Sequence, residues 1–192
     1  MNFCPRCGTS LVSRPEGGRP RPMCPVEGCG FTYYGDASIG TGAVVTRGDE
    51  VLLIERRVPG RTWWQIPGGF VEVDELIHDA IEREVLEETG VVARAVDVVG
   101  FRHAAGVPDR PVANIYVVFR LTAEGGTPRP DGEETFDVRF VHRDRVADWP
   151  GIAAMSVWAI QTALAAPPGM TMEAARDGLQ RPGHTIFRLP GA

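Results

Sequence analysis

The sequence predicts a layered α/β or α+β domain, built from mixed strands and two helices and preceded by a small cysteine-rich module. Three observations lead to this prediction. From about Ser38 onward, short apolar runs alternate with polar turns, as strands do. Two segments repeat apolar residues with a helical period. Residues 1–35 hold all four cysteines and no long apolar periodicity, so something other than a hydrophobic core must fold them.

Length and composition bound the domain count and the cellular setting. A chain of 192 residues suits one ordinary domain plus a small module, and we place the boundaries at 1–35, 38–166 and a C-terminal tail at 167–192. No apolar run approaches the roughly 20 residues of a membrane span, and the N-terminus lacks a signal-peptide core. We therefore expect a cytoplasmic protein with reduced cysteines and no membrane partner. The formal charge of −5 disfavours nucleic acid as a partner.

The strands follow from apolar runs bounded by turn residues. The first two, GAVVT and VLLIE, are joined by the polar turn RGDE. A Pro-Gly-Gly turn at 67–69 ends the third. Strands are expected at 42–46, 51–55, 63–66, 91–101, 112–121 and 135–142.

Helices are expected at about 75–89 and at 152–164. Asp74 can cap the first, and Gly90 stands where a helix C-terminus favours glycine. The second should bury one side, made of Ile152, Met155, Trp158 and Ala159.

The first helix carries an unusual group of carboxylates. At 100° per residue, Glu84, Glu87 and Glu88 occupy one arc of about 100°, with the apolar Ile77 inside it and Ile81 next to it. A helix that buries the apolar residues must aim the carboxylates toward the protein or into a cleft beside it. Two like charges 4 Å apart repel by roughly 4 kcal/mol at an effective dielectric near 20. Protonation or a divalent cation would relieve this, and oxygen ligands favour Mg²⁺, Mn²⁺ or Ca²⁺. A solvated acidic face remains the alternative.

The segment around these carboxylates resembles a known motif. GFVEVDELIHDAIEREVLEETGV, residues 69–91, is similar without departure to the complete Nudix box of the Nudix hydrolases. The preceding WWQIPG also resembles that family, and the strand order extends the likeness to about 38–166. The resemblance implies an α/β/α sandwich with a mixed sheet, in which the box forms a loop, a helix and a loop.

The same resemblance implies a reaction and roles for box residues. Nudix hydrolases cleave the diphosphate of a nucleoside diphosphate linked to another group, X, which here could be ADP-ribose, a nucleotide sugar, a dinucleotide or a nucleoside triphosphate. Glu84, Glu87 and Glu88 match the family's metal-binding glutamates for Mg²⁺ or Mn²⁺, and the Gly68 carbonyl matches a further ligand. Arg83 matches the arginine that orients the glutamates. Glu75 is expected to support the loop-helix geometry.

Other residues are candidates for the base and for substrate binding. Glu84 is one candidate base, and the loop GEETFD supplies others in Glu133, Glu134 and Asp137. Arg56 and Arg57 could pair with phosphate. The adjacent Trp63 and Trp64 face opposite sides of a strand, so one should be core and the other, for which Trp64 is the candidate, could stack on a nucleobase. Loop solubilisers, exposed arginines and core packing are the respective alternatives.

The cysteines form two pairs, each followed by glycine. Four thiolates in this pattern can bind one tetrahedral Zn²⁺, which would fold a module that lacks a core. Disulfides or free thiols are the alternative. The predicted zinc ligands are Cys4, Cys7, Cys24 and Cys29. A structural or subunit-contacting role for this zinc ribbon leaves a homodimer open.

A zinc ribbon ahead of a Nudix domain resembles the NADH pyrophosphatases. Their Ser-Gln-Pro-Trp-Pro-Phe-Pro motif is absent from the corresponding GFRHAAGVPDRPVANIY, residues 100–116, so the substrate stays open. The competing hypothesis is a nucleotide-sensing regulator that binds through a Nudix-like domain without turnover. The intact glutamates favour the enzyme, because a binder does not need them.

Overall fold

The computed structural model describes residues 1–173 and 183–191, which form two compact units. One unit comprises residues 1–37 with 106–112, and the other comprises 38–105 with the described residues from 113 onward. The first contains an antiparallel hairpin of β1 (Val12–Glu16) and β2 (Arg19–Met23). None of the described helices is long and apolar enough to cross a membrane.

The second unit is built on a six-stranded mixed sheet. The order is β5-β4-β3-β7-β6, with β8 paired to β4. The strands are β3 (Ala37–Arg47), β4 (Glu50–Val58), β5 (Arg61–Gln65), β6 (Val91–Ala104), β7 (Ala113–Gly126) and β8 (Thr135–His142). All six predicted strands are present, and most extend further than predicted because their ends carry polar residues.

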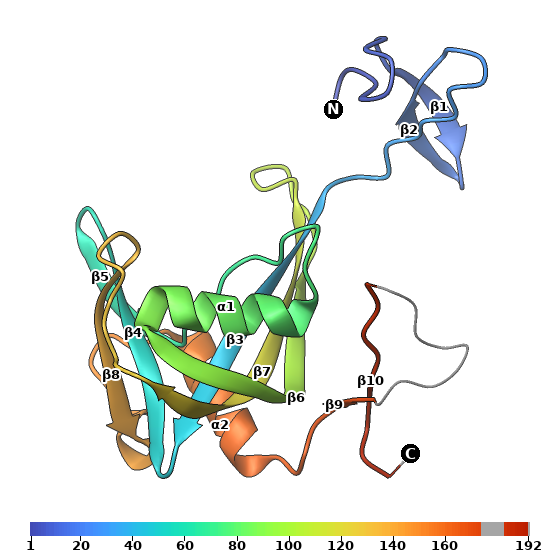
Figure 1. Ribbon diagram of the computed structural model, residues 1–192. Coiled ribbons are helices and arrows are strands. Elements are labelled where there is room, and N and C mark those ends of the chain that lie inside the picture. The colour runs from blue at the N-terminus through green and yellow to red at the C-terminus, as the bar shows by residue number, and fades with distance from the viewer. Residues whose placement is uncertain (174–182, 192) are drawn as a thin grey trace. The chain divides into compact units, whose positions relative to one another are not determined.

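Two helices cover opposite faces of this sheet, α1 (Ile77–Thr89) in front and α2 (Ala154–Ala165) behind (Figure 1). Alternate residues of β4 enter different cores. Leu52 and Ile54 pack with Ile81 and Val85 of α1, whereas Val51 and Leu53 pack with residues of α2. This two-sided burial explains why VLLIE is continuously apolar. The predicted α/β/α sandwich is confirmed.

The predicted cap of α1 was wrong. The helix begins at Ile77 after Leu76, whose side chain makes no capping hydrogen bond, and Asp74 lies in the preceding turn. Glu75 also lies outside the helix, in the preceding loop. Its carboxylate accepts hydrogen bonds from the Glu72 N–H and from Arg83, which hold it there. At the other end Gly90 takes a left-handed conformation, φ 66°, and its N–H donates to the Leu86 carbonyl, as predicted.

The predicted buried side of α2 was partly wrong. Ser156, Ala159, Ile160 and Ala163 are buried and form one stripe at helical spacing. Trp158 lies about 100° from Ala159 and is 41% exposed. Its ring lies beside Gly100 of β6, where a Cβ would come within 3.1 Å of it. Trp158 therefore covers the edge of the sheet.

The segment after α2 joins the core. β9 (Thr171–Met172) pairs with β10 (Phe187–Arg188), and Met170 exchanges backbone hydrogen bonds with Val98. Buried Asp97 fixes the connection, because its carboxylate accepts from the Gly169 N–H at 2.8 Å and pairs with Arg120 at 3.2 Å. Two-residue strands have no readable period, so the sequence alone predicted only a tail here.

Candidate active site and cysteine cluster

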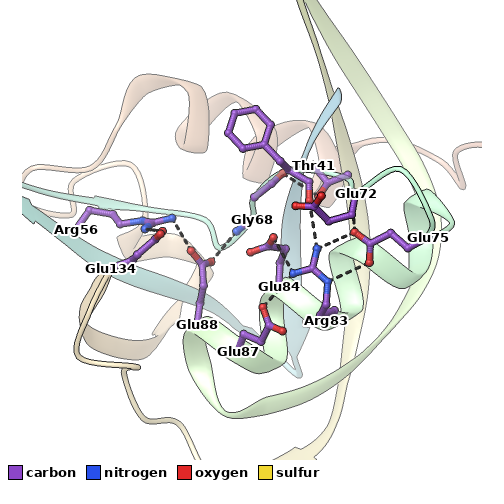
Figure 2. Close-up of polar contacts among 12 residues, drawn as sticks. Thr41, Arg56, Gly68, Glu72, Glu75, Arg83, Glu84, Glu87, Glu88 and Glu134 are labelled. Atoms are coloured by element: carbon purple, nitrogen blue, oxygen red, sulfur yellow. Dashed lines mark hydrogen bonds and ion pairs between the residues drawn. The ribbon is translucent and has the colours of Figure 1, made fainter. Parts of the chain in front are cut away.

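The Pro-Gly-Gly turn is attached to β3. The Thr41 N–H donates to the Gly69 carbonyl at 2.8 Å, and the Ala43 N–H donates to the Pro67 carbonyl at 2.9 Å. Gly68 has a φ of 151°, and a Cβ there would lie 2.1 Å from the Thr41 carbonyl oxygen. Only glycine fits this backbone, which brings the turn against the carboxylate side of α1 (Figure 2).

Glu88 is the most buried of the three box glutamates, with 3% of its surface exposed. Its carboxylate accepts from the Gly68 N–H at 2.8 Å and from Arg56 at 2.5 Å. Burial raises the pKa of Glu88 to about 7, although Arg56 and the Gly68 N–H oppose this and Glu84 adds to it. A buried carboxylate beside another carboxylate is stabilised by any cation that reaches it.

Arg83 joins the other acidic residues of the box (Figure 2). Its guanidinium binds both oxygens of Glu75, at 3.0 and 2.7 Å. It also donates to Glu84 at 3.0 Å and to Glu87 at 2.9 Å. The hydrogen bonds from Arg83 lower the pKa of Glu75, whereas burial raises the pKa of Glu84. The Glu75–Arg83 pair ties the loop to the helix, as the sequence predicted.

Gly69 makes room for Glu84. A Cβ at position 69 would lie 2.3 Å from the Glu84 carboxyl carbon and 2.4 Å from each of its oxygens, which is too close for any side chain. Glu84 therefore rests against the bare backbone of the turn. Glu87, in contrast, is exposed. Of the three carboxylates that were expected to point inward, only Glu88 is buried, and Glu84 is partly buried.

The donor set suits a hard divalent cation, because it consists of carboxylate oxygens and a nearby backbone turn. Ion pairs offset the negative charge of the three carboxylates: Arg56 pairs with Glu88, and Arg83 pairs with Glu84 and Glu87. Gly68 and Gly69 of the turn leave no space for a side chain, and the Glu84 carboxylate lies against Gly69. The chemistry of these donors fits Mg²⁺ or Mn²⁺.

The four predicted substrate contacts fall on two faces of the sheet. Arg56 faces α1 and pairs with both Glu88 and Glu134. Its neighbour Arg57 faces the other side, pairs with Glu55, and lines a pocket of about 520 Å³ together with Trp64. The structure thus brings Arg56 and Glu134 to the carboxylates, and places Arg57 and Trp64 away from them.

The sequence suggested Trp64 as the tryptophan that stacks on a nucleobase, and the structure places it elsewhere. It is only 9% exposed and packs edge-on against Trp149, with ring centroids 5.6 Å apart. Its partner Trp63 is the more exposed of the two. Trp64 is therefore the core member of the pair, and the stacking role that the sequence suggested for it has no support in its burial.

The loop before β8 brings the carboxylate of Glu134 to the site. Asp131 accepts hydrogen bonds from the backbone N–H groups of Glu133, Glu134 and Thr135 at 2.8–3.0 Å. This cap orients Glu134 toward Arg56, whereas Asp137 pairs with Arg139 in the pocket on the other face. Sequence reasoning missed Asp131, although Asp-Gly before a polar run is a turn signal.

The four cysteines converge in the small unit. Their sulfur atoms lie within 4.8 Å of one another, with Cys4–Cys29 at 3.6 Å and Cys7–Cys24 at 3.5 Å. Tetrahedral Zn–S bonds of about 2.3 Å require sulfur separations of about 3.8 Å, close to these values. The glycines after the pairs, Gly8 and Gly30, have φ of 72° and 65°. The cluster is consistent with a zinc ribbon.

The comparisons with known proteins agree with this geometry. The NUDIX domain family profile matches residues 37–159. The NAD-capped RNA hydrolase NudC of Stutzerimonas stutzeri is 30% identical over 165 residues, which cover 85% of this chain and 56% of that protein. The ADP-ribose pyrophosphatase of Methanocaldococcus jannaschii is 30% identical over 99 residues, covering 50% of this chain and 57% of that one. The chain thus spans a little over half the length of these relatives.

A solved structure matches over most of the fold. The crystal structure of a NUDIX hydrolase from Nitrosomonas europaea superimposes with a TM-score of 0.69 at 25% sequence identity. The match covers 88% of this chain and 96% of that one.

Proposed function

The chain belongs to the Nudix hydrolase family, and from that premise we propose that it is a metal-dependent pyrophosphohydrolase. Its substrate is a nucleoside diphosphate linked to a sugar or to a second nucleotide. One observation carries the proposal: Glu84, Glu87 and Glu88 are held beside the Gly68–Gly69 turn by Arg83 and by the Gly68 N–H. The relatives act on NAD-capped RNA and on ADP-ribose, as their names state, which supports this substrate class.

The residues that would hold Mg²⁺ are Glu84, Glu87 and Glu88, with the Gly68 carbonyl as a further ligand. When bound, Mg²⁺ would lower the pKa of water and offset phosphate charge. Arg83 fixes two of the three carboxylates, so its role is to orient them. The four cysteines would hold one structural Zn²⁺.

Glu134 is the best-placed base outside the box. It shares Arg56 with buried Glu88, and the Asp131 cap holds its backbone. An anionic substrate competes with these carboxylates for Arg56, because guanidinium binds phosphate as readily as carboxylate. Arg56 would then bind phosphate and release Glu134 to accept a proton.

The test is a substrate panel with Mg²⁺ and mass-spectrometric analysis of the products. ADP-ribose, NADH, NAD-capped RNA and nucleoside triphosphates should be compared, and release of a nucleoside monophosphate identifies both linkage and substrate. Glu88→Gln keeps the shape of the side chain and should lower kcat at least about 10²-fold, the scale expected when one charge-stabilising group is lost.

Glu87→Gln should act in the same direction, and the exposed Glu50→Gln serves as the matched control. Unchanged turnover in both box variants, with unfolding temperatures equal to the parent's, would show that these carboxylates are not the metal site. Binding of a nucleotide without any product would favour the sensor hypothesis instead.

A further inference from the structure

Tyr116 of β7 is half-buried and lies on the α2 face of the sheet. Two glycines of β3 make room for its ring. A Cβ at Gly42 would lie 2.2 Å from the Tyr116 hydroxyl oxygen, and a Cβ at Gly40 would lie 3.0 Å from the ring. The tyrosine is therefore seated directly on the β3 backbone, in a space that any larger residue at these positions would fill.

This seat adjoins the box turn. Gly42 also packs against Gly68, since a Cβ on Gly68 would come within 2.8 Å of the Gly42 Cα. The Gly68 N–H in turn binds Glu88. The Tyr116 hydroxyl therefore lies against the part of β3 that packs on the turn, and the same turn binds the Glu88 carboxylate.

Charged residues of the site influence the Tyr116 hydroxyl. Burial raises the pKa of Tyr116 to about 12, the Glu88 carboxylate contributes in the same direction, and Arg102 and Arg56 oppose them. The hydroxyl is therefore protonated at neutral pH and can donate a hydrogen bond.

Arg102 is held beside Tyr116. Its guanidinium lies 5.4 Å from the centre of the tyrosine ring and donates to Asn114 at 2.8 Å. Asn114 in turn donates to the Ser38 hydroxyl at 3.0 Å. Among the described residues, Asn114 is the one hydrogen-bond acceptor that the Arg102 guanidinium uses.

The Tyr116 hydroxyl itself lacks a protein partner. Across residues 1–173 and 183–191, no protein group hydrogen-bonds to it. A half-buried hydroxyl donor beside a cation, next to a site for phosphates, is a typical recognition element for an anionic oxygen.

We propose that Tyr116 is a substrate-binding residue whose hydroxyl donates a hydrogen bond to a phosphate oxygen of the bound nucleotide, with Arg102 as the adjacent cation. The proposal rests on the proposed function. It adds to the box carboxylates a substrate contact from β7, beside the turn. Neither residue belongs to the box, and the sequence alone predicts only that Tyr116 lies in a strand.

The test compares Tyr116→Phe with the parent enzyme, using Mg²⁺ and the panel substrate with the highest kcat/KM. Losing a hydrogen bond to a charged acceptor should raise KM about tenfold. The value of kcat should stay within about twofold, because binding that is equal in ground and transition states affects KM alone. The unfolding temperature should not fall, since the hydroxyl has no protein partner to lose.

Two further variants make the result decisive. Tyr34→Phe removes a hydroxyl from an exposed tyrosine of the small unit and should leave KM unchanged. Gly42→Ala keeps the Tyr116 hydroxyl but displaces it, so KM should rise as in Tyr116→Phe.

Each negative result has a separate meaning. An unchanged KM in Tyr116→Phe, with an active parent, overturns this proposal and leaves the proposed function standing. A lower unfolding temperature with unchanged KM would assign the hydroxyl a structural role and also overturns it. A parent that hydrolyses no substrate in the panel overturns the proposed function and this inference together.

Discussion

Gly69→Ala tests whether the position of Glu84 matters. Alanine at this position would put its Cβ 2.3 Å from the Glu84 carboxyl carbon, whereas ordinary contacts begin at 3.4 Å. The carboxylate must therefore retreat by about 1 Å, away from the turn and from its 3.0 Å hydrogen bond with Arg83. Gly69 does not have a positive φ, so the backbone itself tolerates alanine.

The expected cost is in catalysis and not in folding. The displaced group is the end of a flexible side chain, so the unfolding temperature should change little. A misplacement of about 1 Å in a reacting site can cost about 10²-fold in rate, or about 2.7 kcal/mol. We expect that loss in kcat/KM, measured with Mg²⁺ and the substrate that the panel identifies. The matched control is Gly125→Ala, because nothing lies within 4 Å of a Cβ there.

A double-mutant cycle separates this mechanism from a general disturbance of the turn. If the loss acts through Glu84, adding Gly69→Ala to a Glu84→Ala enzyme should cost little more. Parent-like activity of Gly69→Ala would refute the idea that Glu84 must rest against the turn. An equal loss in the Glu84→Ala background would refute the pathway.

Two further predictions concern stability and metal content. The parent should contain one zinc per chain by elemental analysis after mild chelation of Mg²⁺, and Cys24→Ser should contain none; zinc-free parent protein would exclude the ribbon. Asp97→Asn should lower the free energy of unfolding by about 3 kcal/mol in a denaturant titration, because it breaks a buried ion pair. Glu50→Gln, which breaks an exposed pair with Arg47, should change it by less than about 1 kcal/mol; equal effects would mean that Asp97 does not anchor the C-terminal segment.

The sequence predicted the elements that depend on local patterns. The six strands, the two helices, the Gly90 C-cap and the cysteine pairs all follow from spacing and turn residues. The box carboxylates were also predicted, because helical phase relates Glu84 and Glu88 to the apolar residues of the same helix. Such features need no knowledge of distant contacts.

Contacts between distant segments decided the rest. Period-two alternation predicts that Arg56 and Arg57 face opposite sides, but both faces of this sheet are covered, so the sequence does not say which side meets α1. The same ambiguity misplaced Trp64. Asp74 was a reasonable local cap, yet Glu75 and Arg83 hold the turn in another conformation. The position of Tyr116 beside the turn becomes apparent only from its close approach to Gly42, which is distant in the sequence.

The most direct test of the central claim is anomalous diffraction from crystals soaked with Mn²⁺ and a non-hydrolysable nucleotide. We predict manganese peaks coordinated by Glu84, Glu87 and Glu88, next to the Gly68 carbonyl and the nucleotide's phosphates. A bound nucleotide with no manganese at these carboxylates would contradict it.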